Sequence, residues 1–312
     1  MPDTESTASS TPPPSRGRQW AWLAAGVGLV ILLSALATPL LVASGGRWVA
    51  NQALDAGEPA RGEPWLRLGL RLHAGSADLH DSLGTLLFAE GRAAEALDHF
   101  QQAIRLDGSL ASAQNNVGAA LLSLQQPAAA IPYLQAAVTL NPGQAVAFAN
   151  LGHAYYRAAQ LDAALTAYQR AFELDPTQAD ARAQWAAIQF EWGRLDQAAQ
   201  AWQTVLNQNS QHLAARRGLG AVAALQNRSQ EAVRLLVRVL EESPNDAVAA
   251  YYLGLAYRDL ARVDDAAAAF EKAAVHSQDT RLTRLARAEL LTLYGQSNAV
   301  DPVPLPEPDT NR

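Results

Sequence analysis

The feature of this 312-residue sequence that most constrains its fold is a spacing of 34 residues. A small residue recurs six times at this interval: Gly84, Gly118, Gly152, Ala186, Gly220 and Gly254. Twelve residues after each of them stands an alanine, and four residues further a large apolar residue: Phe100, Leu134, Tyr168, Trp202, Leu236 and Phe270. A period of this length indicates a repeat architecture, in which a single unit cannot bury its apolar face and stacked neighbours share one continuous core.

The pattern inside each unit predicts two antiparallel helices. Small residues allow two helix backbones to approach closely, and the large apolar residue fills the space beside them. Several units close with a proline, as at Pro142, Pro176 and Pro244, because proline cannot donate the hydrogen bond that would continue a helix. Pro132 falls early within the second helix expected in the second unit, so we expect a bend there rather than a break.

The third unit, residues 145–178, shows the pattern most fully. Its signature positions are Phe148, Leu151, Gly152, Tyr155, Ala164, Tyr168, Ala171 and Pro176. In these residues the sequence resembles the tetratricopeptide repeat family. The resemblance implies an all-α, right-handed solenoid of about six helix-turn-helix repeats over residues 77–280. The expected repeats are 77–110, 111–144, 145–178, 179–212, 213–246 and 247–280. The fourth departs most, with Ala186 in place of glycine and Gln189 in place of an aromatic residue.

The segments outside the six repeats differ in composition. Residues 44–76 fit one further, degenerate helical unit that Pro59 and Pro64 interrupt. Residues 281–295 predict an amphipathic helix that caps the last repeat. The tails 1–19 and 296–312 are rich in polar residues and proline, and we expect both to be disordered.

One segment, residues 20–43, predicts a transmembrane helix. It holds 24 residues without a charge, which as a helix would span about 36 Å. Trp20 and Trp22 at its start suit the membrane interface. Arg16 and Arg18 precede it, and this slight excess of positive charge favours a cytoplasmic N-terminus with the repeats on the extracytoplasmic side.

Two other interpretations of the same segment stay open. Ala35-Leu36-Ala37 fits the small-x-small cleavage pattern of a secretory signal peptide, whose removal would release the body of the chain. The segment would otherwise be a buried helix of a soluble fold, although it lacks the polar face that such a helix shows.

Composition excludes several classes of chemistry. The chain has no cysteine and only one lysine, Lys272, which excludes disulfides, cysteine-ligated metals, thiol nucleophiles and the GxxxxGK[ST] phosphate loop. The net charge of −6 argues against nucleic-acid binding. Residues 218–223 match GxGxxA, but no strand is expected before them and Gly220 is already a repeat glycine. We therefore expect no enzyme activity, no cofactor, no metal and no nucleic-acid partner.

Candidate binding residues follow from the resemblance, which implies that extended peptides lie in a groove formed by the first helix of each repeat. Asn116, Asn150 and Gln184 share one register position there, and their carboxamides can both donate to and accept from a peptide backbone. The aromatic and arginine residues nearby suit recognition. The expected peptide-binding set is Asn115, Asn116, Asn150, His153, Tyr156, Arg157, Gln184, Phe190, Arg217, Tyr251 and Arg258. A clamp for a terminal carboxylate is excluded, since no cation stands at the positions that such a clamp requires.

These observations predict a membrane-anchored, non-catalytic scaffold that binds a protein or extended peptide and supports assembly or maturation of an envelope complex. The alternative is a substrate-recruiting accessory subunit of a separate enzyme, resembling the repeat part of a glycosyltransferase. A self-associating structural protein is a third possibility. The sequence leaves the identity of the partner and the oligomeric state open.

Overall fold

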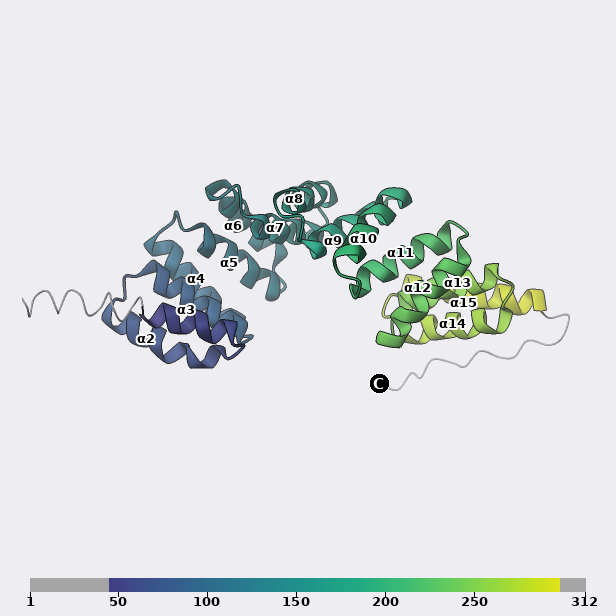
Figure 1. The fold of residues 1–312 in the computed structure, drawn as a ribbon, viewed down its shortest axis with the longest axis horizontal. Helices are drawn as coiled ribbons and strands as arrows, with labels where there is room; N and C mark the ends of the chain where they lie inside the picture. The colour runs from purple at the N-terminus through teal and green to yellow at the C-terminus, as the bar shows by residue number, and fades with distance from the viewer. Residues whose placement is uncertain (1–44, 298–312) are drawn as a thin grey trace, which may run out of the picture. The chain divides into compact units, whose positions relative to one another are not determined.

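A computed structural model describes residues 45–297. The predicted membrane segment 20–43, the predicted tail 1–19 and all but the first two residues of the predicted tail 296–312 lie outside these described residues. Residues 296 and 297 belong to helix α15 (Thr280–Ser297). The described part is all helical and contains no strand, which confirms the expected all-α fold (Figure 1). None of its helices has both the length and the apolar character needed to cross a bilayer.

The chain divides into two compact units, which meet in sequence between Gln126 and Pro127. We name the described residues 45–126 unit 1 and residues 127–297 unit 2. The division falls between the two helices of the second expected repeat, 111–144, so the repeat boundaries stay a prediction.

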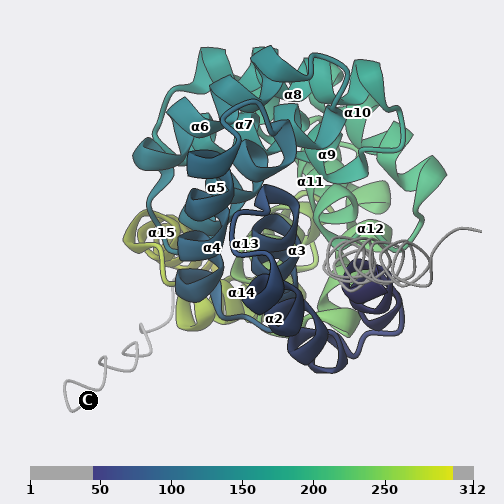
Figure 2. The same cartoon turned by 90° about the vertical axis from the view of Figure 1, so that its left-hand side faces the viewer.

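Unit 1 begins with a helix over residues 45–55 and continues through a series of helix hairpins. Its further elements are the 3₁₀-helix η1 (Pro59–Arg61) and the α-helices α2 (Glu63–Leu72), α3 (Ala77–Ala89), α4 (Ala93–Leu106) and α5 (Ala111–Ser123). Both views show α2 beside α3 at the edge of this unit (Figures 1 and 2).

Unit 2 holds ten helices that pack in chain order. They are α6 (Pro127–Leu140), α7 (Ala145–Arg157), α8 (Leu161–Leu174), α9 (Ala179–Glu191), α10 (Leu195–Gln208), α11 (Leu213–Leu225), α12 (Ser229–Glu242), α13 (Ala247–Asp259), α14 (Val263–His276) and α15 (Thr280–Ser297). Pro132 lies inside α6, which continues unbroken past it. Helix α15 continues past Gly295, where we expected the capping helix to end.

The recurring small residues act as the sequence predicts. A Cβ atom on Gly152 would lie 2.6 Å from Cδ1 of Tyr168, and one on Gly84 would lie equally close to the ring of Phe100. Gly254 meets Phe270 in the same way. In these three hairpins the aromatic ring of the second helix therefore packs directly on the backbone of the first helix, and a larger residue in place of the glycine would force the two helices apart.

A second 34-residue regularity was not apparent from the sequence pattern. The turn between the two helices of each repeat contains one residue with a positive φ: Gly91, Gln125, Ala159, Gly193, Asn227 and Ala261. A left-handed residue after a helix end allows the chain to reverse, and glycine and asparagine adopt it most easily. Only three of the six are glycine or asparagine, which is why this register did not stand out.

Candidate peptide-binding groove

Unit 2 contains a groove with a volume of about 910 Å³. Its walls come from α7, α9, α11 and α13, which are the first helices of their hairpins, together with the start of α15. We refer to it as the aromatic groove, because five aromatic side chains line it: Tyr156, Phe190, Trp192, Trp202 and Tyr252.

The floor of the aromatic groove is formed by three small residues of α11, Ala214, Gly218 and Ala221. Gly218 has no room for a side chain, since a Cβ atom there would lie 2.5 Å from Cζ2 of Trp202. Trp202 is 4% exposed, and its indole nitrogen donates a hydrogen bond of 3.2 Å to the carbonyl oxygen of Ala183. The indole is therefore fixed in place against the floor.

Aromatic residues from three helices of unit 2 meet beside this floor. The ring of Phe190 on α9 lies 5.7 Å from that of Trp202 and 6.0 Å from that of Tyr252 on α13. Such tilted and edge-to-face contacts are favourable. Burial raises the pKa of the Tyr252 hydroxyl, so this group is a neutral hydrogen-bond donor at physiological pH.

The rim of the groove carries charges that largely neutralise one another. Nη1 of Arg217 lies 3.0 Å from Oδ2 of Asp246, and the Tyr156 hydroxyl donates to Oε1 of Glu191 over 3.3 Å. Val248 and Leu285 on the opposite wall are 38% and 43% exposed. The groove therefore offers apolar and aromatic surface with little net charge.

Four of the expected peptide-binding residues line this groove: Tyr156, Gln184, Phe190 and Arg217. The sequence analysis also chose Tyr251, but the structure places its neighbour Tyr252 in the groove instead. Tyr251 packs on Phe270, with a ring distance of 5.8 Å. The helical register decides between the two tyrosines, and the repeat pattern alone did not resolve it.

The remaining expected residues of unit 2 do not line the groove. Arg258 donates to Oε2 of Glu289 on α15 over 2.6 Å, so it ties the last helix to α13. Asn150, His153 and Arg157 lie on α7, where His153 and Arg157 are exposed. They remain predicted contacts for a peptide that extends beyond the groove.

In unit 1 the expected residues belong to a polar cluster that is already hydrogen-bonded. The Asn116 side-chain amide donates to Oδ1 of Asp81 over 2.9 Å, and the Ser112 hydroxyl donates to Oδ2 over the same distance. Asn115 is buried and donates to the side-chain oxygen of Asn116 over 3.3 Å. Burial raises the pKa of Asp81 although these bonds oppose the rise. A ladder over Asn116, Asn150 and Gln184 involves both units and stays a prediction.

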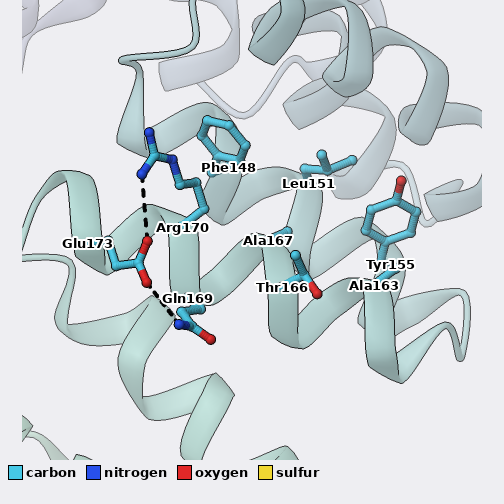
Figure 3. Close-up of a pocket in the computed structure, with 9 residues that line it drawn as sticks. All are labelled: Phe148, Leu151, Tyr155, Ala163, Thr166, Ala167, Gln169, Arg170 and Glu173. Atoms are coloured by element: carbon cyan, nitrogen blue, oxygen red, sulfur yellow. Dashed lines mark hydrogen bonds and ion pairs between the residues drawn. The ribbon is translucent and has the colours of Figure 1, made fainter.

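A second hollow, of about 610 Å³, lies on unit 2 between α7 and α8 (Figure 3). Figure 3 shows Phe148 and Leu151 of α7 on one side and Ala167 of α8 on the other. At its edge the Glu173 carboxylate accepts a hydrogen bond of 2.8 Å from Gln169 and lies 3.6 Å from Arg170. Its polar groups thus satisfy one another, and it contains none of the expected binding residues.

The described residues contain no group of three histidine, aspartate or glutamate side chains that could hold a metal ion. His80 pairs with His99, with 3.0 Å between their Nδ1 atoms. The spacing of the two residues in the sequence did not reveal this contact. Residues 218–223, which match GxGxxA, lie inside α11.

Comparison with known proteins identifies the family. One tetratricopeptide repeat model matches residues 145–178, and a second matches 82–145, 188–247 and 226–280. A comparison with curated protein sequences found no match.

Solved structures show the same fold. The chain is similar to a Pseudomonas aeruginosa pilF structure at 18% identity, covering 72% of this chain and 98% of that one with a TM-score of 0.62. A tetratricopeptide repeat protein from Parabacteroides merdae ATCC 43184 is 17% identical over 82% of this chain and 98% of its own, with a TM-score of 0.54. YrrB, described as having an unusual peptide-binding site, is 23% identical over 59% and 95%, with a TM-score of 0.50. Since the family models match more than half of the sequence, the chain belongs to the tetratricopeptide repeat family.

Proposed function

We propose that this protein is a membrane-anchored scaffold that binds an extended segment of a partner protein in the aromatic groove and supports assembly or maturation of an envelope complex. The observation that carries the proposal is the groove itself, a volume of about 910 Å³ with aromatic walls and a backbone floor at Gly218. Grooves of this composition bind by burying apolar side chains, with a few polar groups to fix orientation.

The chemistry of the groove suggests the kind of segment that fits. Phe190 and Tyr252 line the groove and offer ring surface to an apolar side chain of the partner. Gln184 is exposed at the same wall, and its carboxamide can pair with a peptide backbone irrespective of sequence. Because Arg217 is already paired with Asp246, a strongly charged segment would gain little there.

The membrane part of the proposal is supported by the apolar segment 20–43. A tether raises the effective concentration of the groove for a partner in the same membrane without adding a contact. The arginines that precede the segment support a position of the repeats on the extracytoplasmic side.

A site-specific photocrosslinker in the full-length chain tests groove binding. We would place it at Val248, which lines the groove, and as a matched control at Val263 on α14, which does not. The two valines have similar exposure, 38% and 42%. We expect crosslinks from position 248 to map to one extended segment of one partner, and to decrease when Phe190→Ala is added.

Equal crosslinking from both positions would contradict binding in the groove. A captured segment that belongs to a glycosyltransferase would instead favour the accessory-subunit function. Topology is tested separately, since the natural chain lacks cysteine: Val275→Cys, at a residue that is 75% exposed, should react with a membrane-impermeant maleimide from the extracytoplasmic side.

A further inference from the structure

An apolar face is exposed on the first two helices of unit 1. Its large side chains are Trp48, Trp65, Leu68 and Leu72, which are 62%, 50%, 40% and 50% exposed. We name these four residues the end face. Three of them lie on α2 and the fourth on the helix that packs against it, and large apolar side chains exposed together on one helix indicate a contact with another phase or molecule.

The packing of the two helices explains why these side chains are exposed. Helix 45–55 packs on α2 through Gly46, whose absent Cβ would lie 3.1 Å from the Trp65 carbonyl oxygen, and through Ala50 against Gly62. Gly46 and Ala50 are one turn apart, so Trp48 between them lies on the opposite side of its helix.

On α2 the inner and outer residues separate in the same way. Leu66 is fully buried, whereas Trp65, Leu68 and Leu72 follow the i, i+3, i+7 spacing of a single outer stripe. The exposure of Trp65, Leu68 and Leu72 shows that the neighbouring helices of unit 1 leave this stripe open.

Basic residues accompany the apolar ones. Arg61 stands one turn before Trp65, and Arg71 stands one turn after Leu68, so both fall on or beside the outer stripe. The Arg61 side chain is 77% exposed and pairs with Glu58, whose side chain is 50% exposed. Tryptophan, leucine and arginine on one face is the composition of helices that lie in the membrane interface, where indole rings sit among the headgroups and guanidinium groups reach the phosphates.

The sequence also fixes how far this face is from the predicted anchor. Trp48 follows Ala43, the last residue of the apolar segment 20–43, by five residues. Five residues span about 8 Å as a helix and at most about 18 Å when extended. If the segment crosses the bilayer, Trp48 cannot leave the interfacial region.

We infer that the end face lies in the interfacial layer of an anionic membrane, where it holds unit 1 against the lipid surface from which the chain emerges. This inference rests on the membrane anchor of the proposed function. The end face adds a second, peripheral contact to that of the anchor, so that unit 1 itself lies against the bilayer surface.

The test uses single cysteines in the full-length chain, reconstituted in vesicles of phosphatidylcholine and phosphatidylglycerol. Leu68→Cys on the end face and Leu106→Cys on α4 form a matched pair, since both leucines are 40% exposed and both belong to unit 1. Each is labelled with an environment-sensitive nitrobenzoxadiazole dye. We expect the dye at position 68 to emit at shorter wavelength and to be quenched by lipids that carry a nitroxide near the headgroup, and the dye at 106 to show neither effect.

Flotation of the vesicles separates the two levels of the proposal. Protein that floats with the vesicles while position 68 stays unquenched overturns the docked face but leaves the anchor in place. A blue shift that grows with protein concentration and occurs without quenching also overturns the membrane contact of the end face. That outcome would show that a second copy of the chain covers the end face. Protein that does not float refutes the anchor and the docked face together. Arg61→Gln/Arg71→Gln provides a further check, because it should weaken quenching in anionic vesicles more than in neutral ones.

Discussion

At equivalent positions of the repeat pattern, the first helices of unit 1 and of unit 2 carry different kinds of surface. In unit 1, Ser112 and Asn116 both donate hydrogen bonds to the Asp81 carboxylate, so the polar side chains at these positions bind one another. In unit 2, Gly218 and its small neighbours on α11 leave space that Phe190 and Tyr252 border. The repeat framework thus constrains the contacts between helices and leaves the first-helix face free to differ, so binding capacity is a property of a unit and not of the family.

The fourth repeat shows how this difference arises. In the third repeat the ring of Tyr168 packs on Gly152 of its own first helix. In the fourth, Ala186 replaces that glycine, and the larger ring of Trp202 packs instead against Gly218 of the next first helix. A departure from the pattern in one repeat is therefore matched by a glycine in its neighbour, and the pair creates the floor of the groove.

The largest expected effect comes from removing the large aromatic side chain in either unit. Trp202→Ala and Phe100→Ala should each lower the free energy of unfolding by about 3–5 kcal/mol, since both residues are almost fully buried. Hydrogen exchange should localise the loss to the affected repeat and its neighbours, because solenoid repeats contact only adjacent units. Only Trp202→Ala should also abolish crosslinking from Val248. Loss of crosslinking in both variants would show that the groove is not the separate property of unit 2.

A smaller effect is expected from filling the floor of the groove. Gly218→Ala places a methyl group against the fixed Trp202 ring and should cost about 1–3 kcal/mol. Gly143→Ala is the matched control in the same unit, since its Cβ would meet only the Asn141 side chain at 3.6 Å, and its effect should stay within about 0.5 kcal/mol. Adding Trp202→Phe to Gly218→Ala should cost less than the sum of the two single changes in a double-mutant cycle, and strict additivity would refute the contact.

Unit 1 should respond to acid through the pair His80 and His99. Burial lowers the pKa of both imidazoles from 6.5, and the charges of Arg105 and Arg67 nearby lower them further, against the opposing effect of Asp98 on His99. The unfolded chain then binds more protons between the folded and unfolded pKa values. The stability of unit 1 is therefore complete above about pH 6.5 and decreases as the pH falls through the folded pKa, and solvent screening keeps this loss small for a partly exposed pair.

Hydrogen exchange corrected for intrinsic rates measures this effect. Protection of α3 and α4 should decrease between about pH 7.5 and 5.5, and His99→Gln should flatten the response. Equal loss of protection in α11 and α12 would contradict a cause that is local to unit 1.

The smallest expected effect is a gain in stability. Burial raises the pKa of Asp81 above 3.8, so its contribution is complete below that pH and decreases as the pH rises through the folded pKa. Asp81→Asn keeps the acceptor for Asn116 without the buried charge, and at neutral pH it should stabilise unit 1 by less than about 1 kcal/mol. Denaturant unfolding at about pH 4 and 7 should show that this advantage shrinks in acid. A variant that is less stable than the natural chain at neutral pH would show that the charged hydrogen bonds outweigh the cost of burial.

Much of the fold was predictable because its determinants are local and repeated. The small residue at Gly152 and the ring at Tyr168 have the same relation in several repeats, so spacing alone reveals their contact. The groove was predictable only in part. Tyr156, Gln184, Phe190 and Arg217 were expected, whereas Trp202 was assigned to packing and Tyr252 was passed over for Tyr251. The left-handed turn residues were missed because alanine, as at Ala159 and Ala261, does not indicate a positive φ in the sequence.

The sequence by itself determined the all-α repeat architecture of this protein, since a 34-residue period of small and large residues buries its apolar side chains by stacking helix hairpins on one another. Only the tertiary structure decided which first-helix residues remain available to a ligand. That outcome depends on contacts between different repeats: Asn116 donates to Asp81, Arg258 donates to Glu289, and the Trp202 ring fills the space where a side chain at position 218 would lie. Periodicity specifies which positions face inward, but the packing of unlike neighbours determines whether they meet each other or leave room for a partner.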